Sequence, residues 1–225
     1  MSNVLKNVVA IIPARGGSKR LANKNILPFG SIPLIAHSIK YAQHYNIKHI
    51  YVSTDDAQIK TIAKDYGAKI IDRPKALALD DSTTVSVLKH ALEFLKEQFT
   101  DVILLQPTNP LRPKSLLKDA YSIYTQNNLT SLFTVSRDYK KLGKINNGNF
   151  IPFNYTFGQR SQDLEPLYYE NGLLYITSKE LIKRDIIFDE TSYPLEVNHK
   201  FAEVDIDTLE DLEYAKYILN TYNDK

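Results

Sequence analysis

The stretch Val8-Val9-Ala10-Ile11-Ile12-Pro13-Ala14-Arg15-Gly16-Gly17-Ser18-Lys19-Arg20 joins a short apolar run to a basic loop that contains two glycines. Residues 8–12 are uninterrupted by polar side chains, which is typical of a strand buried on both faces of a sheet. The basic loop begins where this strand ends, and in open α/β sheets ligands bind at the carboxyl ends of the strands. The stretch therefore predicts an α/β fold with a binding site after its first strand.

Short apolar runs continue to alternate with helical patterns along the rest of the chain. We expect strands at residues 49–53, 68–71, 101–105, 131–135, 172–177 and 201–204, and helices at 32–44, 57–66, 83–98, 115–126, 178–184 and 208–219. Such alternation predicts a mostly parallel sheet that is covered by helices. Residues 139–170 interrupt it, and their Asn146-Asn147-Gly148-Asn149 is a strong hairpin signal. We expect this region to be a lid or an excursion from the main sheet.

The composition limits the classes of protein to which this chain can belong. Its 225 residues suit one α/β domain, and 28 basic against 26 acidic residues give a net charge of +2, which does not predict a nucleic-acid-binding protein. The absence of cysteine excludes disulfides and thiolate metal sites. The apolar run 8–12 is too short for a signal segment or a membrane span. These features predict a cytoplasmic protein that binds neither nucleic acid nor a membrane.

The loop after the first strand has the composition of an anion site. Its glycines let backbone N–H groups face one point. Arg15 can grip a phosphate with its planar fork, and Lys19 and Lys24 add point charges. The alternative is a solvated loop that happens to be basic, but the glycine pair directly after a strand favours the anion site. The Walker A pattern and the dinucleotide fingerprint are both absent, which disfavours kinases, ATPases and dehydrogenases.

Asp205 and Asp207 follow the expected strand 201–204 and stand two residues apart. Side chains at i and i+2 of a strand point to the same side, so both carboxylates can converge on one Mg²⁺, which prefers a few carboxylates with phosphate and water. The alternative is that Asp207 caps the last helix, with Glu210 reaching back. That alternative explains Asp207 about as well as a metal does but leaves Asp205 unexplained, and both interpretations can hold together.

Two further segments carry polar residues after expected strands. Gln106 opens a loop, 106–112, that two prolines stiffen, and it stands where the strand 101–105 opens toward a ligand. Arg73 ends the third strand and can reach a base carbonyl. The hydroxyls of Ser82, Thr83 and Thr84 can read a base edge, although taken alone residues 82–84 are more typical of a helix cap.

Together these segments resemble the acylneuraminate cytidylyltransferases, also called CMP-sialic acid synthetases, over nearly the whole chain. The residues that carry the resemblance are 12–19, Lys24-Asn25, Ser53-Thr54-Asp55, Arg73-Pro74, 106–112, Asn171-Gly172 with Tyr175, and Asp205-Ile206-Asp207. The resemblance implies a single Rossmann-like, three-layer α/β/α nucleotidyltransferase domain of the GT-A-like type over residues 1–225. It also implies a mostly parallel sheet with a small inserted lobe or dimerisation region at about 139–193.

The resemblance implies that the anomeric hydroxyl of an N-acylneuraminate, a nine-carbon 2-keto sugar acid, attacks the α-phosphate of CTP with the help of Mg²⁺. A CMP-sugar and pyrophosphate result. The family pattern assigns nucleotide binding to Arg15, Gly16, Ser18, Lys19, Lys24, Asn25, Arg73, Ser82 and Thr84, sugar binding to Gln106, Arg160 and Tyr175, and the metal to Asp205 and Asp207. Lys24, Arg15 and Asp207 are expected to carry catalysis.

Members of the family are usually homodimers in which a lobe of one subunit reaches over the other's site, so we expect a homodimer. Three departures from the family pattern lie mostly on the sugar side: Leu21-Ala22-Asn23, Tyr169-Glu170 and a shortened stretch at 139–144. Legionaminic, pseudaminic or 3-deoxy-octulosonic acid (Kdo) are therefore alternative substrates. A non-catalytic nucleotide-binding subunit is an alternative of another class.

Overall fold

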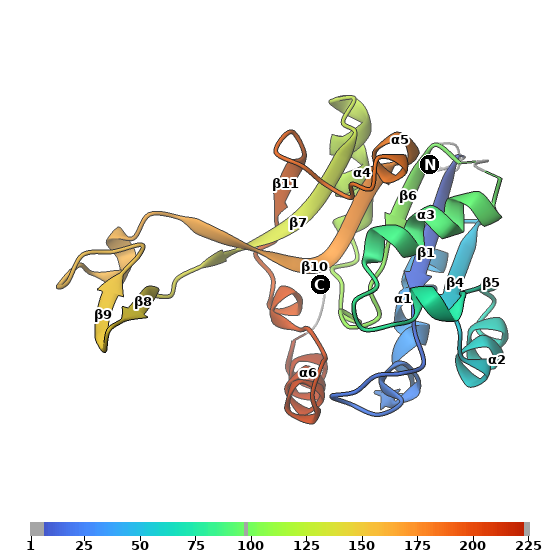
Figure 1. The fold of residues 1–225 in the computed structure, drawn as a ribbon, viewed down its shortest axis with the longest axis horizontal. Helices are drawn as coiled ribbons and strands as arrows, with labels where there is room; N and C mark the ends of the chain where they lie inside the picture. The colour runs from blue at the N-terminus through green and yellow to red at the C-terminus, as the bar shows by residue number, and fades with distance from the viewer. Residues whose placement is uncertain (1–6, 97–98, 223–225) are drawn as a thin grey trace.

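The computed structural model describes residues 7–96 and 99–222. Its centre is a seven-stranded sheet of order β11-β7-β10-β6-β1-β4-β5 (Figure 1). The strands are β1 (Val8–Pro13), β4 (Ile50–Thr54), β5 (Lys69–Asp72), β6 (Asp101–Leu104), β7 (Ser131–Asp138), β10 (Leu167–Ser178) and β11 (Tyr193–Glu196). β10 is antiparallel to β6 and β7, and the other neighbouring strands are parallel. The expected mostly parallel sheet is confirmed.

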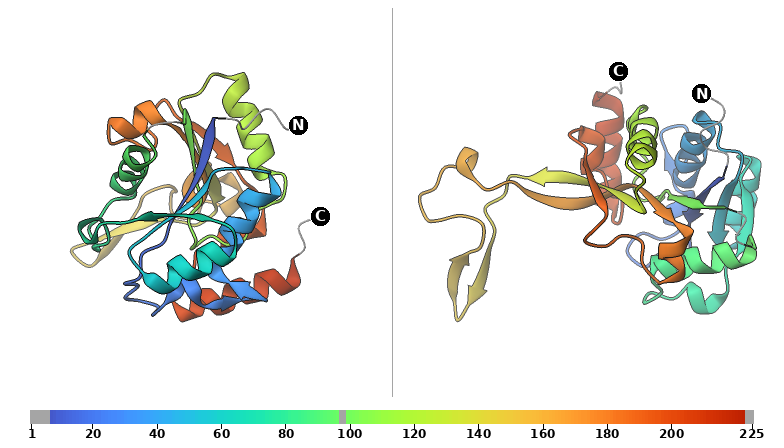
Figure 2. Two further views of the ribbon diagram at one scale, coloured as in Figure 1. Left: turned by 90° about the vertical axis from the view of Figure 1, so that its right-hand side faces the viewer. Right: turned by 90° about the horizontal axis from the view of Figure 1, so that it is seen from above.

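Helices cover both faces of this sheet. They are α1 (Leu34–His44), α2 (Ala57–Asp65), α3 (Thr84–Phe94), α4 (Leu116–Gln126), α5 (Lys179–Lys183) and α6 (Leu209–Thr221), with short 3-10 turns η1 (Lys24–Ile26), η2 (Lys75–Leu77), η3 (Ser161–Asp163) and η4 (Lys200–Glu203). α1, α2 and α4 pack on one face, and α3 and α5 pack on the other (Figure 2). The three-layer α/β/α arrangement is therefore confirmed.

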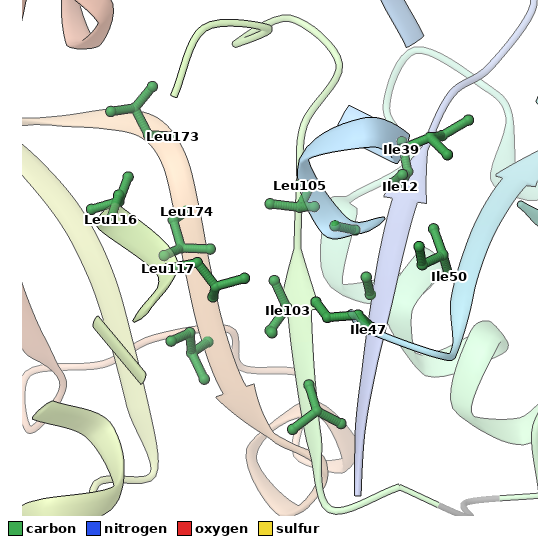
Figure 3. Packing of buried hydrophobic residues seen from close by; sticks show 14 of the residues in the cluster. Ile12, Ile39, Ile47, Ile50, Ile103, Leu105, Leu116, Leu117, Leu173 and Leu174 are labelled. Carbon is green, nitrogen blue, oxygen red and sulfur yellow. The ribbon is translucent and has the colours of Figure 1, made fainter. Parts of the chain in front are cut away.

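The first strand shows how a continuous apolar run serves both faces. Successive side chains of a strand point to opposite sides. Val8, Ala10 and Ile12 accordingly pack with α1 and α4, whereas Val9 and Ile11 pack with α3. Figure 3 shows the first of these two sides from close by. The run 8–12 is apolar throughout because β1 has no face that meets solvent.

A third apolar cluster joins segments from the two ends of the chain. Leu212, Ala215 and Ile218 of α6 pack against Phe29 and Leu34, which follow the loop of β1. A short hairpin of β2 (Pro28–Phe29) and β3 (Ile32–Pro33) lies in the same region. The start of α6 is thereby placed next to the basic loop, as Figure 1 shows.

Beyond the sheet, β7 and β10 lead into a projecting arm, residues 139–166 (Figures 1 and 2). Within the arm, β8 (Gly143–Asn146) pairs with β9 (Asn149–Pro152), and Asn147 and Gly148 turn the chain with φ of 48° and 78°. Positive φ at both positions is the two-residue turn that Asn-Gly favours, so the predicted hairpin is confirmed. Of the range 139–193, residues 139–166 form the arm, whereas β10 and α5 return to the main body.

Residues 201–204 do not form the strand that their apolar composition predicts. Residues 201–203 belong to η4, at whose start the His199 ring accepts a hydrogen bond from the Phe201 N–H at 3.1 Å. Residues 204–208, which include both aspartates, are irregular. The expectation that the pleat of a strand orients Asp205 and Asp207 was therefore wrong.

Three element boundaries also differ from the sequence prediction. The helix expected at 32–44 begins at Leu34, because Ile32 and Pro33 pair with β2. The helix expected at 83–98 ends at Phe94, Lys96 has a φ of 51°, and residues 97–98 lie outside the described residues. β10 begins at Leu167 rather than at residue 172. In the described ranges no helix is long and apolar enough to cross a membrane.

Candidate active site

A pocket of about 510 Å³ opens at the carboxyl ends of β1, β5 and β6. Its polar wall consists of Arg15, Ser18, Lys19, Arg20, Lys24 and Asn25 after β1, Arg73, Asp80, Ser82 and Thr84 after β5, Gln106 and Thr108 after β6, and Asp207 before α6. Loops that follow parallel strands meet at one edge of the sheet, which is why segments far apart in the sequence converge here. Most of the predicted site residues are brought together.

Asp80 holds two cations of the loop after β1. Arg15 Nη1 lies 2.6 Å from Asp80 Oδ1, and Lys19 contacts the other carboxylate oxygen. The hydrogen bonds from Lys19 and then Arg15 lower the pKa of the Asp80 carboxyl. The sequence did not predict Asp80 as a site residue. The available signal was its place on a loop that follows a parallel strand, at the same edge as the cations.

Asp207 holds two further cations of the same loop. Arg20 Nη2 lies 2.6 Å from its Oδ2, and Lys24 Nζ lies 2.7 Å from its Oδ1. The Arg20 side chain is 69% exposed, whereas that of Lys24 is only 12% exposed. Solvent therefore screens the charge of Lys24 less than that of Arg20. An anion bound beside Lys24 would therefore interact with a cation that is largely shielded from solvent.

The local backbone explains the position of Lys24. Asn23 has a left-handed φ of 54°, which Asn tolerates better than most residues, and η1 begins directly after it. The buried Asn25 side chain donates from Nδ2 to the Arg15 carbonyl at 3.0 Å. Asn25 thus braces the two ends of the basic loop against each other.

Gly16 meets a packing requirement. A Cβ at Gly16 would lie 2.8 Å from the Cβ of Asp56. The Gly16 N–H donates to Asp55 Oδ1 at 3.0 Å, and the Ser18 N–H donates to the Gly16 carbonyl at 3.0 Å. The N–H groups of Gly16 and Ser18 are therefore both engaged within the protein. The cationic side chains supply the positive charge of the loop.

Arg73 is held in place after β5 by the neighbouring strand. Its Nε donates to the Ser53 hydroxyl at 3.2 Å and its Nη2 to the Ser53 carbonyl at 2.6 Å. Burial lowers the pKa of Arg73 to about 10, so the guanidinium stays charged at neutral pH. Thr83 caps α3 by accepting a hydrogen bond from the Ser86 N–H. The helix-cap interpretation thus holds for Thr83, and its neighbours Ser82 and Thr84 lie on the pocket wall.

Asp207 faces the basic loop because it does not cap α6. The N-cap of α6 is Thr208, whose hydroxyl accepts from the Asp211 N–H, while the Asp211 carboxylate accepts from the N–H groups of Asp207 and Thr208. The expected cap of Asp207 with Glu210 was therefore wrong by one residue. Because Thr208 caps the helix, the Asp207 carboxylate pairs with Arg20 and Lys24 instead.

Asp205 lies beside Asp207, next to the pocket. The residue as a whole is open to solvent, but protein atoms surround much of its carboxyl group. This partial burial, with a smaller contribution from the Asp207 charge, raises the pKa of the Asp205 carboxyl, and a hydrogen bond from the Thr108 side chain opposes the shift. Asp207 lines the pocket, whereas Asp205, two residues earlier, does not.

The residues expected to bind the sugar acid do not all meet. Gln106 lines the pocket. Tyr175 lies buried in β10, where its hydroxyl donates to Glu170. Arg160 lies on the arm, pairs with Asp163 at 2.7 Å, and does not line the pocket of its own chain.

A three-layer α/β/α fold with a cationic loop after β1 and two carboxylates opposite it is the arrangement of a nucleotidyltransferase. The model of the cytidylyltransferase family matches residues 9–223, and the chain belongs to that family.

Relatives of known activity agree with this membership. Pseudaminic acid cytidylyltransferase of Campylobacter jejuni is 37% identical over 95% of this chain and 96% of its own. CMP-N,N'-diacetyllegionaminic acid synthase of Legionella pneumophila is 35% identical over 89% of this chain and 91% of its own. N-acylneuraminate cytidylyltransferase of Streptococcus agalactiae is 32% identical over 90% of this chain and 51% of its own.

A solved structure shares the fold. CMP:2-keto-3-deoxy-manno-octonic acid synthetase complexed with CTP superposes with a TM-score of 0.70 over 96% of this chain and 99% of that chain, at 16% sequence identity. The Rossmann-like nucleotidyltransferase fold expected from the sequence is confirmed.

Proposed function

We propose that this cytidylyltransferase couples CTP to the anomeric hydroxyl of a nine-carbon 2-keto sugar acid, an N-acylneuraminate, and forms a CMP-sugar and pyrophosphate. The observation that carries the proposal is the set of four pocket cations paired with Asp80 and Asp207. A triphosphate is the ligand class whose charge such a set neutralises. Membership in the family supports CTP as the nucleotide.

The chain's own residues suit this chemistry. Nucleotidyl transfer asks a protein mainly for positioning and charge neutralisation. Arg15 and Lys19 would bind the phosphates that leave as pyrophosphate. Lys24 would meet the α-phosphate, where an enclosed cation is most effective as charge develops. Gln106 would orient the sugar acid from the end of β6.

Asp205 and Asp207 would hold the Mg²⁺ ion that the family implies, with Asp207 shared between this ion and its cationic partners Arg20 and Lys24. Two adjacent carboxylates supply the hard oxygen ligands that this ion prefers. Substrate phosphates and water would complete the shell of this ion. When bound, Mg²⁺ would polarise the α-phosphate and help to ionise the attacking hydroxyl.

A second candidate substrate is pseudaminic acid. The pseudaminic acid relative matches this chain in length and at 37% identity, whereas the N-acylneuraminate relative is 32% identical and only half covered. Tyr169 and Glu170 are a departure from the family pattern on the side where the acid would bind. Legionaminic acid and Kdo complete the set to be compared.

The experiment that tests the function is pyrophosphate release from CTP with these four acids, each with Mg²⁺ present. We expect release with at least one acid and none without acid. Asp207→Ala should abolish release, because it removes a metal ligand and the partner of Lys24. Binding of CTP without release by any acid, unchanged in Asp207→Ala, would favour the non-catalytic subunit instead.

We also propose that the chain acts as a homodimer through the arm. Ile145, Phe153 and Phe157 expose 80%, 67% and 73% of their surface there, and exposed apolar clusters of this kind mark interaction sites. Light scattering should give the mass of two chains for the wild type and of one chain for the double variant Ile145→Lys/Phe157→Lys. A wild type of single mass at micromolar concentration would contradict the proposal.

A further inference from the structure

Asp205 lies in an irregular segment, yet the chain is gripped on both sides of it. On the preceding side, the Val204 carbonyl accepts a hydrogen bond from Asn109 Nδ2 at 2.9 Å. On the following side, the Ile206 N–H donates to the Thr108 carbonyl at 2.8 Å. Two consecutive residues of the loop after β6 thus hold the residues on both sides of Asp205.

The Asn109 side chain is fully committed to this grip. It is 1% exposed, so its amide has no access to water. Its Nδ2 donates to the Val204 carbonyl and to the Asn171 carbonyl at 3.0 Å, and its Oδ1 is 3.1 Å from the Thr108 hydroxyl. A Cβ at Gly172, next to the second of these carbonyls, would lie 2.7 Å from Asn109 Oδ1. Asn109 therefore fits its place closely and has no spare donor.

The Asn171 carbonyl, which is the second acceptor of Asn109, links the Asp205 segment to β10, the strand that follows the arm. Asn171 sits at the irregularity in the pairing of β10 with β7. Its buried amide accepts from the Thr134 hydroxyl at 2.6 Å and donates to the Ser136 hydroxyl at 2.9 Å, both on β7. Ser136 in turn donates to the Val197 carbonyl at 3.0 Å. Asn109 is thus the member of this polar network that reaches the Asp205 segment.

We propose that Asn109 is a positioning residue that sets the place of the Asp205 carboxylate for the cation. The inference rests on the metal role given to Asp205 in the proposed function. No strand pleat orients this segment, so loss of the Asn109 amide leaves the Val204 carbonyl without its donor and frees the backbone just before Asp205. Outer partners that orient a metal ligand typically change metal affinity 10- to 100-fold when they are removed.

The test is Mn²⁺ binding to the full chain with CTP present and no sugar acid, so that turnover plays no part. Free Mn²⁺ is followed by electron paramagnetic resonance. Asn109→Asp keeps the size of the side chain but replaces the donor with an acceptor. We expect its Mn²⁺ dissociation constant to rise about tenfold or more, while CTP binding without metal stays within about twofold of wild type. If this variant does not fold, Asn109→Ser serves in its place.

Ser136→Ala is the matched control, because it removes hydrogen bonds from the same buried network without touching residues 204–206. It should lower the melting temperature but keep the wild-type Mn²⁺ affinity. Wild-type Mn²⁺ affinity in the folded Asn109 variants would overturn the inference, as would an equal loss in Ser136→Ala. Absence of Mn²⁺ binding in the wild type would overturn it as well, and would locate the failure in the proposed metal role.

Discussion

Lys24 and Lys19 carry the same charge on the same loop but differ in their surroundings. The Lys19 side chain is 79% exposed, against 12% for Lys24. Because solvent screens Lys19, we expect Lys24→Met to lower kcat by about 10²- to 10³-fold and Lys19→Met to lower it by about tenfold at most. Steady-state kinetics with varied CTP measure both. Equal losses of kcat in the two variants would contradict the special place of Lys24.

The adjacent glycines of the basic loop offer a second pair for comparison. A Cβ at Gly16 would meet the Asp56 side chain at 2.8 Å, whereas one at Gly17 would meet nothing within 4 Å. Gly16→Ala should therefore reduce the free energy of unfolding by about 1–3 kcal/mol, and Gly17→Ala should leave it nearly unchanged. Denaturant unfolding measures the difference. A Gly17→Ala variant as unstable as Gly16→Ala would show that loop freedom, not the clash, is what matters.

Asp80 is the anionic partner of two cations in the pocket wall. It contacts Arg15 and Lys19, which are expected to bind the triphosphate. Asp80→Asn removes this competing charge, so we expect CTP to bind about two- to fivefold more tightly, with a steeper dependence on salt. Calorimetric titration measures the affinity, with Asp81→Asn as the control. Weaker CTP binding in Asp80→Asn would mean that Asp80 contributes to the nucleotide site directly.

Residues that share one pocket could be predicted from the sequence where a single loop carried the signal. The basic loop after β1 was recognisable because Arg15, Lys19 and Lys24 follow a buried strand with no break. Asp80 and Asn109 were missed because their roles exist only after distant segments have met. The sequence around a single acidic or amide residue in a loop does not predict which distant residue it will contact in the folded chain.

The N-termini of α6 and α4 differ in their side-chain caps. Thr208 caps α6 and forms a capping box with Asp211, whereas Ser115, at the start of α4, makes no side-chain cap bond. Thr208→Ala should lower the free energy of unfolding by about 1 kcal/mol, and Ser115→Ala should change it little. Thermal unfolding would show a shift of about 2–4 °C for Thr208→Ala. An equal shift for Ser115→Ala would refute the assigned caps.

Continuous apolar runs predicted β1 and β6, because a strand that is buried on two faces carries mostly apolar side chains. They gave no signal for β11 (Tyr193–Glu196), which was not expected from the sequence. The same rule failed for residues 201–204, whose apolar side chains pack under α6 without pairing to a strand. It also failed for the first part of β10, where the exposed Tyr168 and Tyr169 pair only with β7. An apolar segment predicts that its side chains are buried, but burial alone does not distinguish a strand from a 3-10 turn.

In the whole molecule, the pocket depends on the meeting of two segments from opposite ends of the chain. Arg20 and Asp207 are 187 residues apart in sequence and form an ion pair. The two segments meet although the strand expected before Asp205 does not form, because the packing of α6 on the segment after β1 brings Asp207 to the basic loop. The place of Arg160 was beyond prediction from the sequence, because the arm leaves the sheet and its direction depends on how β7 and β10 extend past it.

The fate of each phosphate of CTP distinguishes cytidylyl transfer from every other use of this pocket. Each reaction contains the wild-type chain, Mg²⁺, one of the four sugar acids, and CTP labelled with ³²P at either the α- or the γ-position. We expect the α-label to enter a CMP-sugar only when an accepted acid is present, and the γ-label to appear only in pyrophosphate. Transfer of the γ-label to the sugar acid, or release of either label as inorganic phosphate without a CMP-sugar, would contradict the proposed reaction.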